Sequence, residues 1–263
     1  MKTCYALPQL LFLTLFFFLS TVGWGQTTTI NFETMGDGYT PSSTEGSGDT
    51  DVFNRTNPDI GGNSTYIWAV EDISLTNPSL TLDGINISGA TSFTFSIDML
   101  AHHFEDWDNS DALNITYNLD GGPEENLLWV RNAGGTFNEA ASLDSDFDGV
   151  GDCVDVLPAL TTGTSGCTVS ANTFETFSTG SIALSGNSTL NITLQFFELT
   201  SDDEGIYLDN IVIDVTGTGG GNNCNLTASN LSNITCFDNG TPSDASDDYI
   251  EFDLDPSGHT CPK

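Results

Sequence analysis

The sequence predicts an all-β protein built as an antiparallel jelly-roll β-sandwich that carries an acidic calcium loop. Apolar and polar residues alternate with a period of two in several segments, which places one face of each strand in a core and the other in water. Clusters of Gly, Asn, Asp and Ser separate these segments, as in a sandwich of short strands. No segment shows the period of an amphipathic helix.

The N-terminal residues 1–25 have the pattern of a secretory signal peptide. Lys2 supplies a positive charge, an apolar run follows from Leu10 to Leu19, and small residues precede a cleavage point ahead of Gln26. The run is short for a membrane span, and a single N-terminal anchor is the alternative. We therefore expect a secreted, extracellular or cell-surface-associated protein whose mature chain does not insert into a membrane.

The mature domain, residues 26–216, is expected to hold one sandwich. Its clearest strands alternate large apolar residues with Thr, Ser, Asn and Asp, and the domain is long enough to bury its own core. The predicted strands cover 28–33, 66–71, 79–87, 93–99, 113–119, 126–131, 172–178, 190–196, 205–209 and 211–215.

A second, truncated module follows. Residues 217–222 are rich in glycine and are expected to be a flexible linker. Residues 223–263 contain one further alternating run, Tyr249 to Leu254. Roughly 40 residues are too few for an independent core without a covalent staple, so we interpret them as the opening strands of an incomplete β module.

The charge of the chain excludes some partners. It has 37 acidic and 4 basic residues, a formal net charge of −33. Binding to phosphate relies on Lys and Arg, so nucleic acid and anionic membranes are not expected partners. Carboxylates in such number either keep a protein soluble or bind hard cations.

The acidic segment 144–155, DSDFDGVGDCVD, has the spacing of a calcium loop. Carboxylates occupy positions 1, 3, 5, 9 and 12, and Gly149 occupies position 6. Calcium needs six to eight oxygens, so alternate residues turn inward while glycine allows a sharp bend. The predicted ligands are Asp144, Asp146, Asp148, the Val150 carbonyl, Asp152 and Asp155.

Asp155 stands where such loops usually carry Glu, and its shorter side chain predicts a weaker site with Kd about 10⁻⁴ to 10⁻³ M. A solvated acidic turn without an ion is the alternative. The loop resembles the calcium-binding repeats of thrombospondin type 3 and dockerin modules, in which the ion organises the backbone.

Two further cation sites are weaker predictions. Glu33 and Asp209 lie near the two ends of the sandwich, and terminal strands that run side by side would bring them together; surface acids on edge strands are the alternative. Asp106, Asp108 and Asp111 could form another site beside Trp107, or a plain acidic loop.

Aromatic side chains are the candidates for ligand binding. An apolar sugar face stacks on an aromatic ring while polar groups bind its hydroxyls. Trp68, Trp107 and Trp129 are the predicted sugar-binding residues, although core packing is the alternative for each.

Cysteines in an exported chain favour disulfide bonds. We predict pairs between neighbours, Cys153 with Cys167 and Cys224 with Cys236, which leaves Cys261 over. No nucleophile elbow, zinc-protease motif or phosphate loop is present, so no catalytic residue is predicted.

The run from Ile30 to Val215 resembles a jelly-roll module of secreted multidomain surface proteins of environmental bacteria. The matching pieces are INFET, SLTLDGINISG, FTFSIDMLA, FEDWDNSDALNITYNLDGG, DFDGVGD and YLDNIVIDV. The C-terminal residues look like the start of an Ig-like adhesin repeat. This resemblance implies a calcium-stabilised carbohydrate-binding or adhesion module, with polysaccharide or a cell-surface glycan as partner. An accessory domain of an extracellular hydrolase and a structural spacer are the alternatives.

Overall fold

The computed structural model describes residues 25–47, 51–101, 106–152, 166–201, 204–217, 226–237 and 249–258. The chain divides into two compact units, Met1–Gly221 and Asn222–Lys263. Residues 1–24 of the predicted signal peptide and the glycines after Gly217 lie outside the described residues, so both assignments stay predictions.

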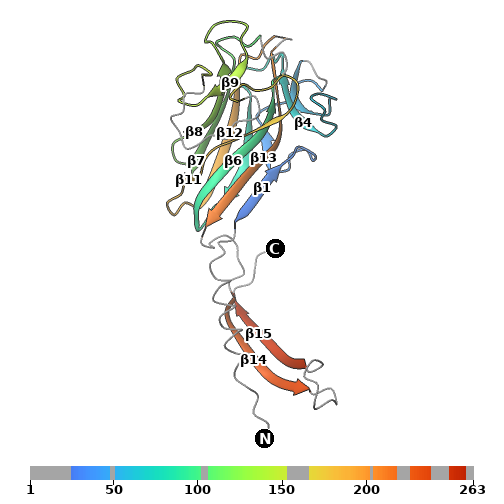
Figure 1. Ribbon diagram of the computed structural model, residues 1–263, viewed down its shortest axis with the longest axis vertical. Helices are drawn as coiled ribbons and strands as arrows, with labels where there is room; N and C mark the ends of the chain where they lie inside the picture. Colours follow the sequence, from blue (N-terminus) through green and yellow to red (C-terminus); the bar gives the residue numbers. More distant parts are fainter. Residues whose placement is uncertain are drawn as a thin grey trace. The chain divides into compact units, whose positions relative to one another are not determined.

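The first unit is a sandwich of two antiparallel sheets (Figure 1). We call sheet A the one with strand order β10-β6-β13-β4-β3, in which β1 also pairs with β13 and β11 with β6. Its strands are β1 (Gln26–Ile30), β3 (Val52–Thr56), β4 (Ile67–Glu71), β6 (Ala90–Leu100), β10 (Glu175–Ser178), β11 (Ile182–Ala183) and β13 (Gly205–Gly217).

Sheet B has the order β2-β5-β12-β7-β8-β9. Its strands are β2 (Tyr39–Pro41), β5 (Ser79–Asn86), β7 (Ala112–Leu119), β8 (Glu125–Asn132), β9 (Ala141–Asp144) and β12 (Thr189–Phe197). The described residues contain strands and turns but no helix, which confirms the predicted all-β, antiparallel sandwich.

The core lies between the sheets and follows the predicted alternation. In β12, Leu190, Ile192, Leu194 and Phe196 are fully buried, while the residues between them are half-buried on the other face. Trp68 of β4 packs edge-on against Tyr39 and Phe53 at the centre of this core.

Sheet A is also covered on its outward face at one end. Ile67, Ala69 and Tyr207 belong to a second, smaller apolar cluster, with Ile60 and Phe174 packed against it. This cover explains why β4 is buried on both faces and does not alternate.

Some strand predictions were incomplete. The predicted strands 205–209 and 211–215 form one strand, β13, because a bulge between Asp209 and Val212 lets pairing with β6 continue. Asn210 makes this bulge in a left-handed conformation, φ 43°. Strands β2, β3, β9 and β11 had not been predicted, and they are too short to show a period.

The second unit contains a hairpin of β14 (Leu226–Phe237) and β15 (Tyr249–Gly258), in which Phe237 pairs with Tyr249. The alternating run predicted from Tyr249 lies in β15. Its membership of an Ig-like repeat stays a prediction. Among the described residues of both units, no helix is long and apolar enough to cross a membrane.

Candidate functional site

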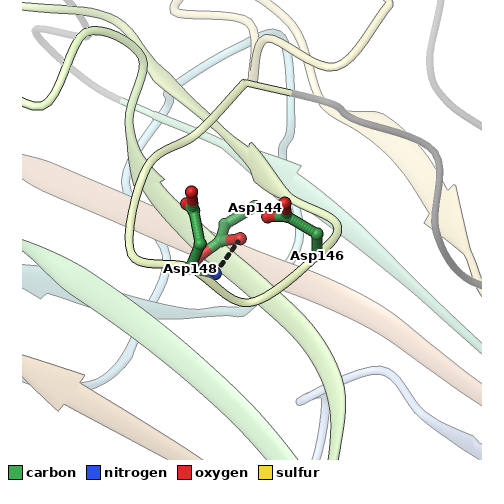
Figure 2. A group of neighbouring side chains, drawn as sticks. All are labelled: Asp144, Asp146 and Asp148. Atoms are coloured by element: carbon green, nitrogen blue, oxygen red, sulfur yellow. Dashed lines mark hydrogen bonds between the residues drawn. The ribbon is translucent and has the colours of Figure 1, made fainter.

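The acidic loop begins at the end of strand β9. Asp144 is the last residue of β9, and the chain then turns so that the carboxylates of Asp144, Asp146 and Asp148 gather on the inside of the loop (Figure 2). One oxygen from each lies within 4.8 Å of the others. Among the described residues, this is the one group of three or more potential acidic, His or Cys ligands at such spacing.

Backbone N–H groups of the loop hold the carboxylate of Asp144. The N–H of Gly149 donates to Oδ2 at 2.8 Å, and the N–H of Asp148 donates to Oδ1 at 3.2 Å. The backbone of Phe147 also bonds this carboxylate. These bonds fix the carboxylate in one orientation, and its two oxygens together have about four acceptor sites, so it can still bind a cation. Burial nevertheless raises the pKa of Asp144.

Two left-handed residues give the loop its shape. Gly149 has φ 100°, as the predicted bend at position 6 requires, and a Cβ there would meet no atom within 4 Å. Its conformation, rather than the space around it, therefore favours glycine. Phe147 has φ 62°, which is unfavourable for a bulky residue.

The donor set fits calcium. Oδ1 of Asp146 is buried and has no hydrogen-bond partner among the described residues, and a buried carboxylate oxygen without a partner is costly. Asp144 is buried and Asp148 is exposed. The three carboxylates therefore lie close together at a site that is partly shielded from water. Asp152 is exposed, and Asp155 lies outside the described residues.

The acidic loop contacts sheet B through an aromatic pair as well as through the backbone hydrogen bond that Gly151 N–H donates to the Asn132 carbonyl at 2.9 Å. The ring of Phe147 lies edge-on to the ring of Trp129, with centroids 5.1 Å apart and planes at 67°. The guanidinium of Arg131 lies over the same indole, 4.5 Å from its centroid. Trp129 is half-buried, and its Nε1 has no hydrogen-bond partner among the described residues.

A cavity of about 400 Å³ opens beside this pair. It lies where the β8–β9 edge of sheet B faces β11 and the turn before it. The rings that line it belong to Tyr117, Trp129 and Phe147. The polar and small residues of the wall are Glu125, Asn126, Asp144, Ser145, Thr179, Ser181 and Ala183. Its aliphatic residues are Leu127, Leu128, Leu143 and Ile182.

Tyr117 and Glu125 form a polar contact in this wall. The Tyr117 hydroxyl donates to Oε2 of Glu125 at 2.5 Å. Burial, and then the hydrogen bond and negative charge of Glu125, raise the pKa of Tyr117. Tyr117, Glu125 and Phe147 are not predictable from local pattern as cavity residues: alternation assigns Tyr117 to the core and cannot show that a cavity reaches it.

The predicted site at Glu33 and Asp209 lies where β1 pairs with β13, so the two terminal strands do run side by side. The N–H of Tyr66 donates to Glu33 Oε1 at 3.1 Å, and the Asn63 amide donates to Asp209 Oδ2 at 3.1 Å. Burial, aided by the charges of Asp98 and Glu33, raises the pKa of Asp209 to about 6. A cation between them stays a prediction.

Asp106, Asp108 and Asp111 do not form a cluster of the kind seen in the acidic loop. Asp106 instead accepts a hydrogen bond from Asn138 at 3.0 Å. Asp111 is buried and shares a hydrogen bond with Glu204. Burial, followed by the charges of Glu204 and Asp108, raises the pKa of Asp111 to about 8.

Two of the three predicted sugar-binding tryptophans are in the core. Trp68 and Trp107 are 0% exposed, so neither ring can stack on a ligand at the surface, and both predictions are corrected. Each lies on the inner side of the sandwich, where apolar burial stabilises the fold. Of these three tryptophans, Trp129 lines the cavity beside the acidic loop.

Cys167 is disulfide-bonded. Cys153, its predicted partner, and Cys224 lie outside the described residues. Cys236 lies in β14, where the structure describes the backbone alone. Both predicted pairings therefore stay predictions.

Comparison with known proteins finds similarity in fold alone. No protein-family model matches the sequence, and no curated protein matches it. A cleaved adhesin domain of Lys-gingipain from Porphyromonas gingivalis is 14% identical, with 74% of this chain and 99% of that chain covered and a TM-score of 0.38.

A xylan-binding domain from Paenibacillus barcinonensis is 11% identical, over 75% of this chain and 99% of that chain, with a TM-score of 0.38. The N-terminal cellulose-binding domain of β-1,4-glucanase C from Cellulomonas fimi is 16% identical, over 74% of this chain and 93% of that chain, with a TM-score of 0.29. Similarity at this level transfers no ligand to this chain.

Proposed function

We propose that this chain is a secreted, non-catalytic module that binds carbohydrate and is stabilised by calcium. The observation that carries the proposal is the cavity beside the acidic loop. It combines the rings of Tyr117, Trp129 and Phe147 with carboxylate, amide and hydroxyl groups. Sugars present apolar C–H faces to aromatic rings and hydroxyls to such polar groups, so this lining matches their chemistry.

A calcium ion in the acidic loop would also stabilise the cavity beside it. Asp144, Asp146 and Asp148 would hold the ion, with the Val150 carbonyl and Asp152 as further ligands. A bound cation neutralises the repulsion among the carboxylates and gives the unpaired Asp146 oxygen a partner. Because Asp144, Ser145 and Phe147 also line the cavity, an ordered loop keeps its wall in place.

The test is titration calorimetry of the full mature chain with cellohexaose, xylohexaose and laminarihexaose, in excess calcium. We expect at least one hexasaccharide to bind. Ser181→Trp places a large ring in the cavity and should weaken binding tenfold or more. Ser185→Trp is the matched control, because Ser185 is exposed and does not line the cavity, and its binding should equal that of the wild type.

Absence of binding to every glycan would contradict the proposed ligand class. Equal binding by wild type and Ser181→Trp, with both folded, would show that the cavity is not the site.

A further inference from the structure

The cavity beside the acidic loop lies beyond the end of strand β9. That strand ends at Asp144, opposite Trp129, whereas β8 begins at Glu125. No described strand pairs with the side of β8 that faces away from β7 between Glu125 and Leu128, and every residue of that stretch lines the cavity. Strand β11 of sheet A forms the opposite wall. The cavity therefore opens between the two sheets, where no strand of sheet B closes the core.

The inner part of this cavity is apolar. A bulge in β8 places Leu127 and Leu128 next to each other, and both are buried, although successive strand residues normally point to opposite faces. Leu143 of β9 is buried as well, and Ile182 of β11 packs against the same core. Four aliphatic side chains, contributed by both sheets, therefore line the cavity.

Buried polar side chains of the lining already have partners within the protein. The Thr179 hydroxyl accepts a hydrogen bond from the Phe95 N–H at 3.1 Å. The Tyr117 hydroxyl donates to Glu125, and the Asp144 carboxylate is held by backbone N–H groups of the acidic loop. A sugar hydroxyl in the inner part would exchange its hydrogen bonds with water for groups that are already bonded, which is costly. The group that fills the inner part should therefore be apolar.

The mouth of the cavity is polar instead. Glu125, Asn126 and Ser181 line the cavity and are exposed, so their carboxylate, amide and hydroxyl groups can bind sugar hydroxyls. The lining is thus divided into an apolar inner part and a polar mouth. A ligand that matches both parts carries an apolar group next to a sugar.

The apolar group is best matched by an aromatic ring. Tyr117, Trp129 and Phe147 line the cavity, and aromatic rings attract one another edge to face in addition to the burial of their area. An apolar cavity of about 150 Å³ can hold a benzene molecule. This cavity, at about 400 Å³, has room for a ring and for part of a sugar beside it.

The ring should carry no charge. Among the described residues that line the cavity none is basic, Glu125 places a carboxylate at the mouth, and the chain has a formal net charge of −33. An anionic group would be repelled. A cationic group would have to leave water for an apolar interior, which is costly as well.

We propose that the cavity binds an uncharged aromatic group attached to the carbohydrate, with the ring between the two sheets and the sugar at the mouth. This inference rests on the proposed carbohydrate-binding function, and it adds the chemical class of the substituent that the site selects. Unsubstituted glycans would fill the mouth and leave the apolar inner part without a partner, so they should bind more weakly than glycans that carry the ring.

The test is titration calorimetry of the full mature chain, in excess calcium, with the phenyl, cyclohexyl and methyl β-glycosides of cellotriose, xylotriose and laminaritriose. For at least one trisaccharide we expect the phenyl glycoside to bind tenfold or more tightly than the methyl glycoside. The cyclohexyl glycoside should bind at least threefold more weakly than the phenyl glycoside, because it buries a similar area without the edge-to-face contacts.

Ile182→Ser removes an aliphatic side chain from the cavity. Leu184→Ser is the matched control, because Leu184 is also half-buried against the same core but does not line the cavity. We expect Ile182→Ser to weaken binding of the phenyl glycoside by about tenfold and to keep that of the methyl glycoside within about threefold. Leu184→Ser should leave both unchanged.

Equal binding of phenyl and methyl glycosides by the wild type would overturn the aromatic group, and the proposed function would still stand if a hexasaccharide binds. Equal binding of phenyl and cyclohexyl glycosides would overturn the preference for an aromatic ring. An equal loss of both glycosides in Ile182→Ser would overturn the cavity as the place of the ring. Binding of phenyl glycosides without any hexasaccharide would support the aromatic group and contradict an unsubstituted glycan as ligand.

Discussion

Trp129 and Asp144 stand opposite each other where β8 pairs with β9. The first carboxylate of the acidic loop and the ring beside the cavity therefore project from the same face of sheet B. Phe147 of the acidic loop packs edge-on against Trp129, so the loop and the cavity wall are in direct contact. A substitution in the loop should therefore change both the stability of the protein and the shape of the cavity.

Replacing Asp146 and Asp148 with Ala should lower the melting temperature in calcium and change it little in chelator. Calcium at about 100 times its Kd adds ~2.7 kcal/mol to the free energy of unfolding. For a domain of this size each kcal/mol raises Tm by about 2–4 °C, so we expect a loss of roughly 5–10 °C. Thermal unfolding with and without calcium measures it.

The matched control replaces Asp37 and Asp59, two exposed acids outside the loop, with Ala. It removes the same charge and should keep the calcium-dependent rise in Tm. An equal loss in calcium and in chelator for the loop variant would contradict ion binding.

Phe147→Ala should destabilise the protein by about 1 kcal/mol, because it removes the edge-on contact with Trp129. Phe147→Gly removes the same contact but relieves the left-handed conformation, φ 62°. It should therefore be more stable than the Ala variant by a few tenths to about 1 kcal/mol. Urea unfolding of the two variants checks this order, and the reverse order would show that strain at Phe147 is absent.

Asp111→Asn should alter the dependence of stability on pH. The pKa of Asp111 is raised from 3.8 to about 8 in the folded protein, chiefly by burial. Between these values the folded state binds more protons than the unfolded state, so this group makes stability fall as pH rises. Asn does not titrate, so the free energy of unfolding of the variant should rise relative to that of the wild type between pH 5 and pH 8.

The measurement is the urea midpoint of both proteins at pH 5, 6, 7 and 8 in chelator. A constant difference between the two midpoints across this range would contradict the raised pKa of Asp111.

Mass spectrometry of peptides should find Cys153 and Cys167 joined by a disulfide bond. Their pairing would join Cys153, which lies inside the acidic segment 144–155, to Cys167, and its reduction should destabilise the fold by a few kcal/mol. Detection of Cys153 as a free thiol in the folded protein would exclude the pair, because Cys167 would then bond elsewhere.

Much of the fold could be predicted from local pattern. Alternation placed Leu190 to Phe196 and Leu113 to Leu119 in strands with the correct face inward, because a period of two is a property of neighbouring residues. Strand β9 escaped prediction since ASLD is buried throughout and shows no period.

The acidic loop could also be predicted from residues that are close in the sequence. Its carboxylates at alternate positions and Gly149 at the bend predicted a cluster, and Asp144, Asp146 and Asp148 do converge. A loop of this kind closes on itself, so spacing along the chain is enough to bring its ligands together.

The sequence by itself determined the longer alternating strands, the acidic loop and the charge of this protein. Only the tertiary structure decided that Trp68 and Trp107 are core residues while Trp129 lines a cavity, and that Asn114, Gln195 and Thr193 share one face of sheet B. The physical reason is that burial and register depend on which strands become neighbours. A shift of one residue between strands would turn every side chain to the other face, and no local pattern fixes that choice.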